Sequence, residues 1–138
     1  MNAHPCLDEF FLRTYETLRY VETDGLGRVD STTLPALLES GRVELLERRP
    51  WQCATANFVI SRLEIDYFAE VLWPGTVEIG TSVREIGCSL VAVSQAVFQS
   101  GRLVATAQTV FAYVDNGTRE PIPLPEAARA ELIERFLK

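Results

Sequence analysis

A short acidic turn near the N-terminus holds the residues of this chain that are best suited to chemistry. The turn reads Glu22-Thr23-Asp24-Gly25-Leu26-Gly27, and an apolar stretch at helical spacing follows it. A carboxylate that faces a cleft can attack a carbonyl carbon or deprotonate a water molecule. Free backbone N–H groups at the start of a helix can hold the oxyanion that then forms. Asp24 is therefore a candidate catalytic residue.

Two structural interpretations of Asp24 stand beside the catalytic one. Asp-Gly between apolar segments is a hairpin signal, but a hairpin needs a second strand and a helical pattern follows here. An aspartate near a helix N-terminus is also favoured by the helix dipole and by turn propensity. Spacing alone leaves these alternatives open. We expect Glu22 to support the turn rather than to perform catalysis.

The scarcity of histidine narrows the possible chemistry. His4 is the only histidine among 138 residues, and it lies close to the N-terminus. Ser-His-Asp and Cys-His mechanisms hold an imidazole against the nucleophile, and catalytic zinc sites commonly use histidine ligands. The three cysteines show no CxxC spacing, so neither a zinc site nor a disulfide framework is indicated. We therefore expect no metal, no separate cofactor, and acid–base work by a carboxylate.

Charge and hydropathy limit the possible partners and location. The net charge is -6 and the basic residues are scattered, which argues against a nucleic-acid partner. No apolar run approaches the roughly 20 residues of a membrane helix, and the N-terminus lacks the pattern of a signal peptide. We expect a cytoplasmic protein without a membrane partner. The length fits a single domain over residues 1–138.

The acidic turn should lead directly into one long helix. Leucines and Gly41 recur at helical spacing over residues 34–46, which predicts a helix of about four turns. Ser31 or Thr32 can cap its start. Two arginines and a proline at residues 48–50 are typical of a helix end.

Strand patterns occupy most of the remaining chain. Short turns between long strands indicate antiparallel neighbours. The element order predicts an α+β domain in which an antiparallel sheet wraps around one long central helix. An exposed edge strand in such a sheet is normally paired or covered, and a homodimer would do this. The predicted strands span residues 10–21, 54–68, 76–86, 90–98 and 103–114, and a helix over residues 126–138 ends the chain.

Three segments resemble one known family. The stretch "RYVETDGLGRVDS" (residues 19–31) resembles the R-[YF]-x-[DE]-[TC]-D-x-x-G-H-V-N-N signature of the 4-hydroxybenzoyl-CoA-type thioesterases, which have the hotdog fold. "LLESGRVELL" (residues 37–46) is similar to the F-x-E-x-A-R helix that follows in that family. "SRLEIDYFAEVLWPGTVEIGTSVREIGCSLV" (residues 61–91) is similar to its next strand and two turns. The resemblance covers most of the chain, and the expected element order agrees with the hotdog order.

The resemblance implies an acyl-CoA thioesterase that releases a carboxylic acid and coenzyme A. Asp24 stands at the position of the family's catalytic aspartate, which is a nucleophile in some members and a general base in others. The family's oxyanion contact, a backbone N–H at the helix start, falls around Ser31, with Gly27 giving close backbone approach. The acyl carrier would be coenzyme A or acyl carrier protein. The family also implies a site at a subunit interface in a homodimer or homotetramer.

The chain departs from the family pattern just after Asp24. Arg28 replaces a histidine, Asp30-Ser31 replaces a pair of asparagines, and Leu34 replaces an aromatic residue. Arg28 is either a solvated loop residue or a cation near the thioester or the pantetheine phosphates. Leu34 implies a differently shaped acyl pocket.

Several charged residues are further candidates for substrate contacts. Basic residues that the family uses near coenzyme A are partly missing, and Arg62, Arg84 and Arg102 could substitute for them or be solvated strand charges. Glu39 occupies a helix position where some relatives of the wider fold place a catalytic carboxylate. In this subfamily that position is usually structural, near the helix's own Arg42.

Two other functions compete with hydrolysis. A hotdog dehydratase would need a histidine together with a carboxylate, and His4 is badly placed for that role. A non-catalytic hotdog protein that binds acyl thioesters or serves assembly would tolerate the changes at Arg28, Asp30 and Leu34. Retention of Asp24 favours the enzyme.

Overall fold

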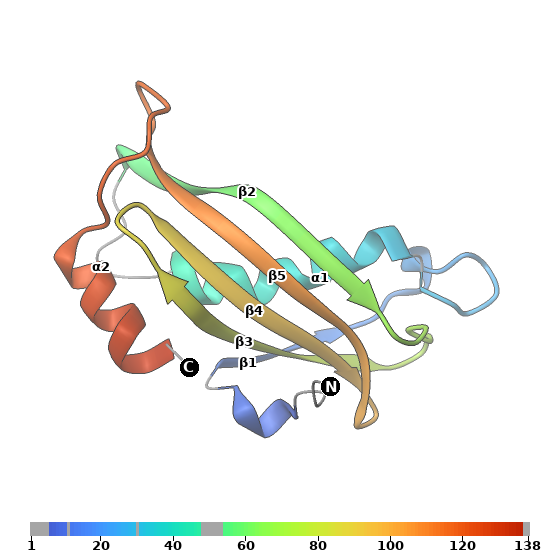
Figure 1. Cartoon of the computed structure of the whole chain (residues 1–138). Helices are drawn as coiled ribbons and strands as arrows, with labels where there is room; N and C mark the ends of the chain where they lie inside the picture. Colours follow the sequence, from blue (N-terminus) through green and yellow to red (C-terminus); the bar gives the residue numbers. More distant parts are fainter. Residues whose placement is uncertain (1–5, 11, 30, 48–53, 137–138) are drawn as a thin grey trace.

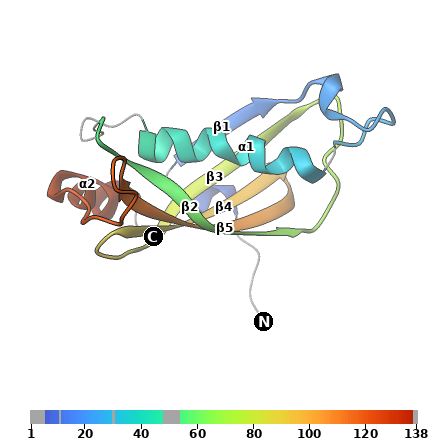
Figure 2. The same ribbon diagram turned by 90° about the horizontal axis from the view of Figure 1, so that it is seen from above.

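A five-stranded antiparallel sheet wraps around helix α1 (Leu34–Arg42) in the computed structural model of this chain (Figure 1; Figure 2). The structure describes residues 6–10, 12–29, 31–47 and 54–136. The strand order across the sheet is β1-β3-β4-β5-β2. This arrangement confirms the predicted α+β architecture. The strands are β1 (Leu12–Thr17), β2 (Ala56–Tyr67), β3 (Thr76–Ile86), β4 (Leu90–Gln99) and β5 (Arg102–Asp115).

The central helix is less regular than the sequence predicts. A 3₁₀ turn (Ser31–Thr33) precedes α1, and a π-helical turn (Val43–Glu47) follows it, so only nine residues are α-helical. The N-cap of α1 is Thr33, whose side chain makes no capping bond, and a capping role of Ser31 or Thr32 in the preceding turn stays a prediction. The predicted helix end at residues 48–50 lies outside the described residues.

Helix α1 approaches the sheet closely at Gly41. A Cβ atom there would overlap Oγ1 of Thr81 on β3, so only glycine fits without a shift of the sheet. Nε2 of the buried Gln95 donates to the carbonyl oxygen of Leu38 over 2.9 Å and lies 3.1 Å from Oγ1 of Thr81. A polar contact inside the core therefore ties the helix to the sheet, and it adds specificity to an otherwise apolar interface.

The first strand is shorter than predicted because a local turn uses its last backbone groups. β1 ends at Thr17, and a 3₁₀ turn (Tyr20–Glu22) follows. The carboxylate of Glu22 accepts the N–H of Arg19 over 2.7 Å, and the N–H of Thr23 donates to Tyr20 over 3.0 Å. These bonds offer the backbone an alternative to the sheet. Glu22 supports the turn, as the sequence suggested.

The C-terminal helix covers one end of the core. α2 (Glu126–Glu131) continues as a π-helical turn (Leu132–Phe136). Leu132 is fully buried and packs in one cluster with Leu45 and Leu46, which follow α1. No helix in the described ranges has the length and apolar character needed to cross a bilayer.

Strand β2 forms an edge of the sheet. Among the described strands, it pairs with β5 alone. Leu63 and Ile65 pack against the core cluster that contains α1. Arg62 and Glu64 alternate with them on the other face, where Nη2 of Arg62 lies 3.2 Å from Oε1 of Glu64.

Candidate active site

The acidic turn folds into a closed loop ahead of the helix. Thr23 and Val29 form an antiparallel bridge, and the N–H of Asp24 donates to the carbonyl oxygen of Arg28 over 2.9 Å. Gly25 and Gly27 adopt φ values of +89° and +84°, a region that glycine occupies without strain. The hairpin signal therefore describes this small loop correctly, although a helix and not a second strand follows it.

The segment of residues 71–73 holds this loop in place. The N–H of Val29 donates to the carbonyl oxygen of Val71 over 2.8 Å, and the N–H of Trp73 donates to that of Gly27, also over 2.8 Å. A Cβ atom on Gly27 would lie 3.6 Å from the backbone oxygen of Trp73. The role expected of Gly27 beside the oxyanion contact stays a prediction.

A glutamine side chain connects this segment to the sheet. Gln99, at the end of β4, accepts the N–H of Leu72 at Oε1 over 2.9 Å and donates from Nε2 to the carbonyl oxygen of Leu72 over 2.7 Å. The side-chain amide of Gln99 thus makes the two backbone hydrogen bonds that a neighbouring strand would otherwise make with Leu72. The position of the acidic loop is set in this way by the core of the sheet.

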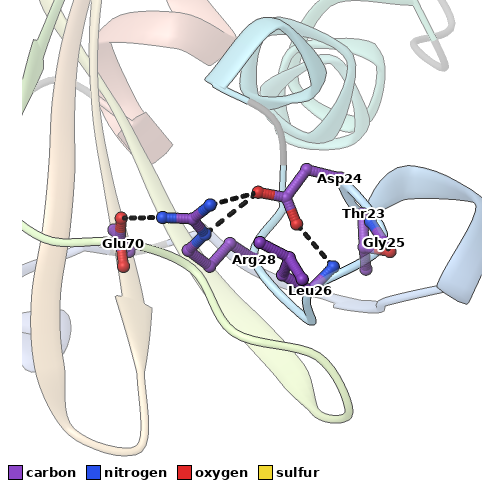
Figure 3. A network of polar contacts seen from close by, with 6 residues as sticks. All are labelled: Thr23, Asp24, Gly25, Leu26, Arg28 and Glu70. Carbon is purple, nitrogen blue, oxygen red and sulfur yellow. Dashed lines mark hydrogen bonds and ion pairs between the residues drawn. The ribbon is translucent and has the colours of Figure 1, made fainter.

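Both carboxylate oxygens of Asp24 are engaged (Figure 3). Oδ1 accepts the N–H of Leu26 over 2.8 Å. Oδ2 accepts Nε–H of Arg28 over 2.9 Å and lies 2.9 Å from Nη2 of the same guanidinium. Nη1 of Arg28 lies 3.8 Å from the carboxylate of Glu70. Arg28 therefore bridges two carboxylates.

These contacts favour the ionised form of Asp24. The N–H of Leu26 is the largest influence that lowers the pKa of Asp24, and the charge of Arg28 lowers it further, against an opposing effect of burial. The carboxyl group is consequently ionised at neutral pH. An ionised carboxylate is the form that a nucleophile or general base requires.

Asp24 lines a cleft of about 530 Å³. Leu34, the first residue of α1, lines the same cleft, as do Tyr67 and Glu70 from the end of β2 and the segment after it. Most of the remaining wall is apolar. A largely apolar cleft of this volume with a few polar groups is typical of small-molecule sites. The apolar wall residues are Val29, Ala69, Val71 and Val104.

The structure brings together only some of the predicted site residues. Asp24, Arg28 and Leu34 share the cleft, and the backbone of Gly27 shapes the loop beside it. Ser31 begins the 3₁₀ turn that leads into α1. Asp30 lies outside the described residues.

Three predicted substrate contacts lie elsewhere in this chain. Glu39 lines two hollows further along α1, and Arg62 pairs with Glu64 on the outer face of β2. Arg84 lines a separate hollow that also contains Ser82. None of the three lines the Asp24 cleft among the described residues, so their roles stay predictions.

Sequence reasoning missed Tyr67 and Glu70. They follow Asp24 by more than forty positions, and no local pattern connects them to the acidic turn. The only available signal is the end of the predicted strand over residues 54–68. That signal locates a strand end but does not show which loop it meets.

Comparison with known proteins agrees with the fold. The sequence model of the thioesterase-like superfamily matches residues 8–132. No curated protein matches the chain significantly. A predicted thioesterase from Bacillus stearothermophilus is 28% identical, with a TM-score of 0.81 over 91% of this chain and 96% of that one.

Two further solved structures carry more specific descriptions. A thioesterase from Thermus thermophilus, complexed with coenzyme A and Zn, is 25% identical, with a TM-score of 0.79 over 91% of this chain and 93% of that one. A 1,4-dihydroxy-2-naphthoyl-CoA thioesterase from Synechocystis is 17% identical, with a TM-score of 0.76 over 88% and 93% of the two chains. The second likeness concerns the fold alone. The family match spans most of the chain, and this hotdog-fold protein therefore belongs to the thioesterase-like superfamily.

Proposed function

We propose that this protein is an acyl-CoA thioesterase, which hydrolyses an acyl thioester to a carboxylic acid and coenzyme A. One observation carries the proposal: an ionised carboxylate and the start of a helix line the same mostly apolar cleft. The apolar wall suits an acyl group. The coenzyme A complex of the similar Thermus thermophilus protein supports the choice of carrier.

Asp24 performs the chemical step in this proposal. As a nucleophile, its carboxylate attacks the thioester carbonyl, coenzyme A leaves as the thiol after protonation, and water hydrolyses the resulting anhydride. As a general base, it removes a proton from a water molecule that attacks the same carbon. In both routes the backbone N–H groups around Ser31 stabilise the oxyanion. No cofactor is needed beyond the coenzyme A of the substrate.

Arg28 acts as a positioning residue in this mechanism. It occupies Oδ2 of Asp24 while its own side chain remains 47% exposed, so it is free to turn away when a substrate enters. Glu70 offers it a second carboxylate at 3.8 Å. A shift of Arg28 toward Glu70 would release one oxygen of Asp24 for chemistry. Leu34 would contact the acyl group.

The remaining proposals concern carrier, assembly and location. Glu39, Arg62 and Arg84 are proposed to contact the coenzyme A part of the substrate or acyl carrier protein, across a homodimer or homotetramer. The exposed β2 edge supports assembly, because unpaired edge strands readily pair with another chain. We expect the protein to act in the cytoplasm.

A non-catalytic acyl-thioester-binding or assembly protein is the alternative. One observation favours it: Leu26 and Arg28 together engage both oxygens of Asp24, as they would for an aspartate that only shapes a loop. Such a protein would bind acyl-CoA without turning it over.

A substrate screen separates the two functions. Purified protein is incubated with short, medium, long and aromatic acyl-CoAs and with acyl carrier protein thioesters, while free thiol release and thioester binding are both measured. We expect thiol release on at least one thioester class. Binding without thiol release would support the alternative, and the absence of both would remove the proposal.

Oxygen-18 water then distinguishes the two routes. Under single-turnover conditions, label in the carboxylate of Asp24 requires an anhydride that water opens at the aspartyl carbon, whereas a general base leaves Asp24 unlabelled and places the label in the product acid.

A further inference from the structure

Arg42 is a buried cation with an incomplete set of partners. Its residue exposure is 8%, and its guanidinium carbon lies 5.9 Å from the ring centroid of Phe111. Among the described residues, Nη1 has no hydrogen-bond partner. Glu39 lines the same hollow and attracts the charge of Arg42, but Nη1 still lacks an acceptor, and a buried unsatisfied N–H is unfavourable until one completes it. The mechanism proposed above does not use Arg42.

Arg42 lines a hollow of about 140 Å³ between α1 and the edge strand β2. Phe58 and Ile60, from the first half of β2, form part of its wall, and Ile60 remains 47% exposed. The Asp24 cleft lies at the opposite end of β2, where Tyr67 and Glu70 contribute to it. The two hollows share no lining residue within one copy.

The outer edges of β2 in two copies of the chain would be complementary in charge. Arg62 and Glu64 lie on the same face of the strand, two positions apart. If two β2 strands pair antiparallel about a two-fold axis at Leu63, Arg62 of each copy lies opposite Glu64 of the other. Opposite charges directly across an antiparallel pair are stabilising. A two-fold contact of this kind is also the commonest form of homodimer.

This pairing joins the two unlike hollows. Antiparallel pairing would place the start of one β2 beside the end of the other, and therefore the Arg42 hollow of one copy beside the Asp24 cleft of the second copy. We propose that Arg42 acts across this dimer interface and completes the acyl cleft of the second copy, where the carboxylate of Glu70 accepts its free N–H. The inference rests on the function proposed above and names a residue that this function lacked.

The charges of the cleft support this assignment. Among the described residues of one copy, the cleft contains the two carboxylates of Asp24 and Glu70 but only one cation, Arg28. A second guanidinium from the other copy balances this charge. It pairs with one oxygen of Glu70 and leaves the other oxygen to Arg28 when that side chain turns away from Asp24. An interfacial arginine with a planar set of donors suits such a carboxylate.

Subunit complementation tests the proposal directly. Arg42→Met and Asp24→Asn are purified as homodimers and as a co-expressed heterodimer with two different affinity tags, and thioesterase activity is compared. We expect each homodimer to be impaired by roughly 10- to 100-fold or more. The heterodimer should regain about half the wild-type rate, because one of its two clefts has both Asp24 and Arg42.

The matched control places both changes in one subunit. A heterodimer of wild type with the double variant Asp24→Asn, Arg42→Met should be impaired, since its one intact Asp24 cleft lacks Arg42 from the other copy. If Arg42 served its own cleft instead, this control would be active and the complementing heterodimer inactive. That reversed pattern would overturn the proposal, as would full activity of the Arg42→Met homodimer.

Cross-linking gives a readout that needs no activity. In a background without the three native cysteines, Arg42→Cys combined with Glu70→Cys should yield a covalent dimer with a short bis-maleimide. Glu44→Cys combined with Glu70→Cys should not, because Glu44 lines a hollow on the β1 side of α1. Absence of the first cross-link would refute the proposal even in an active enzyme. A cross-link in a protein without thioesterase activity would refute only the proposed function.

Discussion

Arg28 and Asp24 form the tightest charged contact of the candidate site. Nε and Nη2 of Arg28 each lie 2.9 Å from the same oxygen, Oδ2 of Asp24, and the backbone of the two residues closes the loop over a further 2.9 Å. Arg28, one of the residues that depart from the family signature, therefore contacts the carboxylate of the candidate catalyst directly. Its effect on Asp24 is electrostatic as well as geometric.

Replacement of Arg28 by methionine should shift the acid limb of the pH–rate profile. The pKa of Asp24 is lowered in the folded protein, first by the N–H of Leu26 and then by Arg28. The active carboxylate is therefore present above this lowered pKa and is lost as the pH falls through it. Without Arg28 the pKa of Asp24 rises. On acidification, the loss of activity should therefore begin at a higher pH than in the wild type. The measurement is kcat/KM against pH.

Arg119→Met is the matched control for this experiment. It removes the same type of side chain from an exposed position after β5, outside the Asp24 cleft. Its acid limb should coincide with that of the wild type. An acid limb that stays in place or moves to lower pH in Arg28→Met would contradict the role given to Arg28.

Replacement of Gln99 by methionine should weaken the support of the acidic loop. The variant loses the two hydrogen bonds to Leu72 at 2.9 and 2.7 Å. We expect a loss of about 1–3 kcal/mol in the free energy of unfolding, measured with urea, because two backbone groups lose their partner. Activity should fall as well, since residues 71–73 anchor the Asp24 loop. Gln108→Met, which removes the acceptor of the Ser94 hydroxyl outside the Asp24 cleft, should retain activity.

Replacement of Gly41 by alanine should push α1 away from the sheet and destabilise the protein. The added methyl group overlaps Oγ1 of Thr81 and comes within 2.8 Å of Nε2 of Gln95. We expect a destabilisation of about 1–3 kcal/mol from overpacking, measured by thermal unfolding. The double variant Gly41→Ala, Thr81→Ala should recover part of the loss. A Gly41→Ala protein as stable as the wild type would show that this approach is looser than described.

The sequence was sufficient to predict the sheet and the place of the helix, because periodicity and turn residues act locally. The sequence overestimated the length of β1, because the turn around Glu22 uses backbone hydrogen-bonding groups in a way that the alternation of side chains does not reveal. It overestimated the regularity of the central helix for a similar reason. The leucine spacing fixes which face is buried, but it does not distinguish α from 3₁₀ or π turns.

The candidate site was only partly predictable for a different reason. Asp24, Arg28 and Leu34 are close in sequence, so one motif identified all three. Glu70 reaches Arg28 only through the folding of residues 71–73 against the acidic loop. Gln99 supports that contact from β4. Long-range contacts of this kind carry no local sequence signal.

Turnover by Asp24→Asn, measured on the best acyl-CoA substrate of the wild type, tests the central claim most directly. The amide keeps the size of the side chain but lacks the basicity and charge of the carboxylate. We predict that kcat falls by at least about 100-fold, while thermal unfolding shows that the variant remains folded. Turnover by folded Asp24→Asn at the wild-type rate would contradict the claim that Asp24 performs the chemistry.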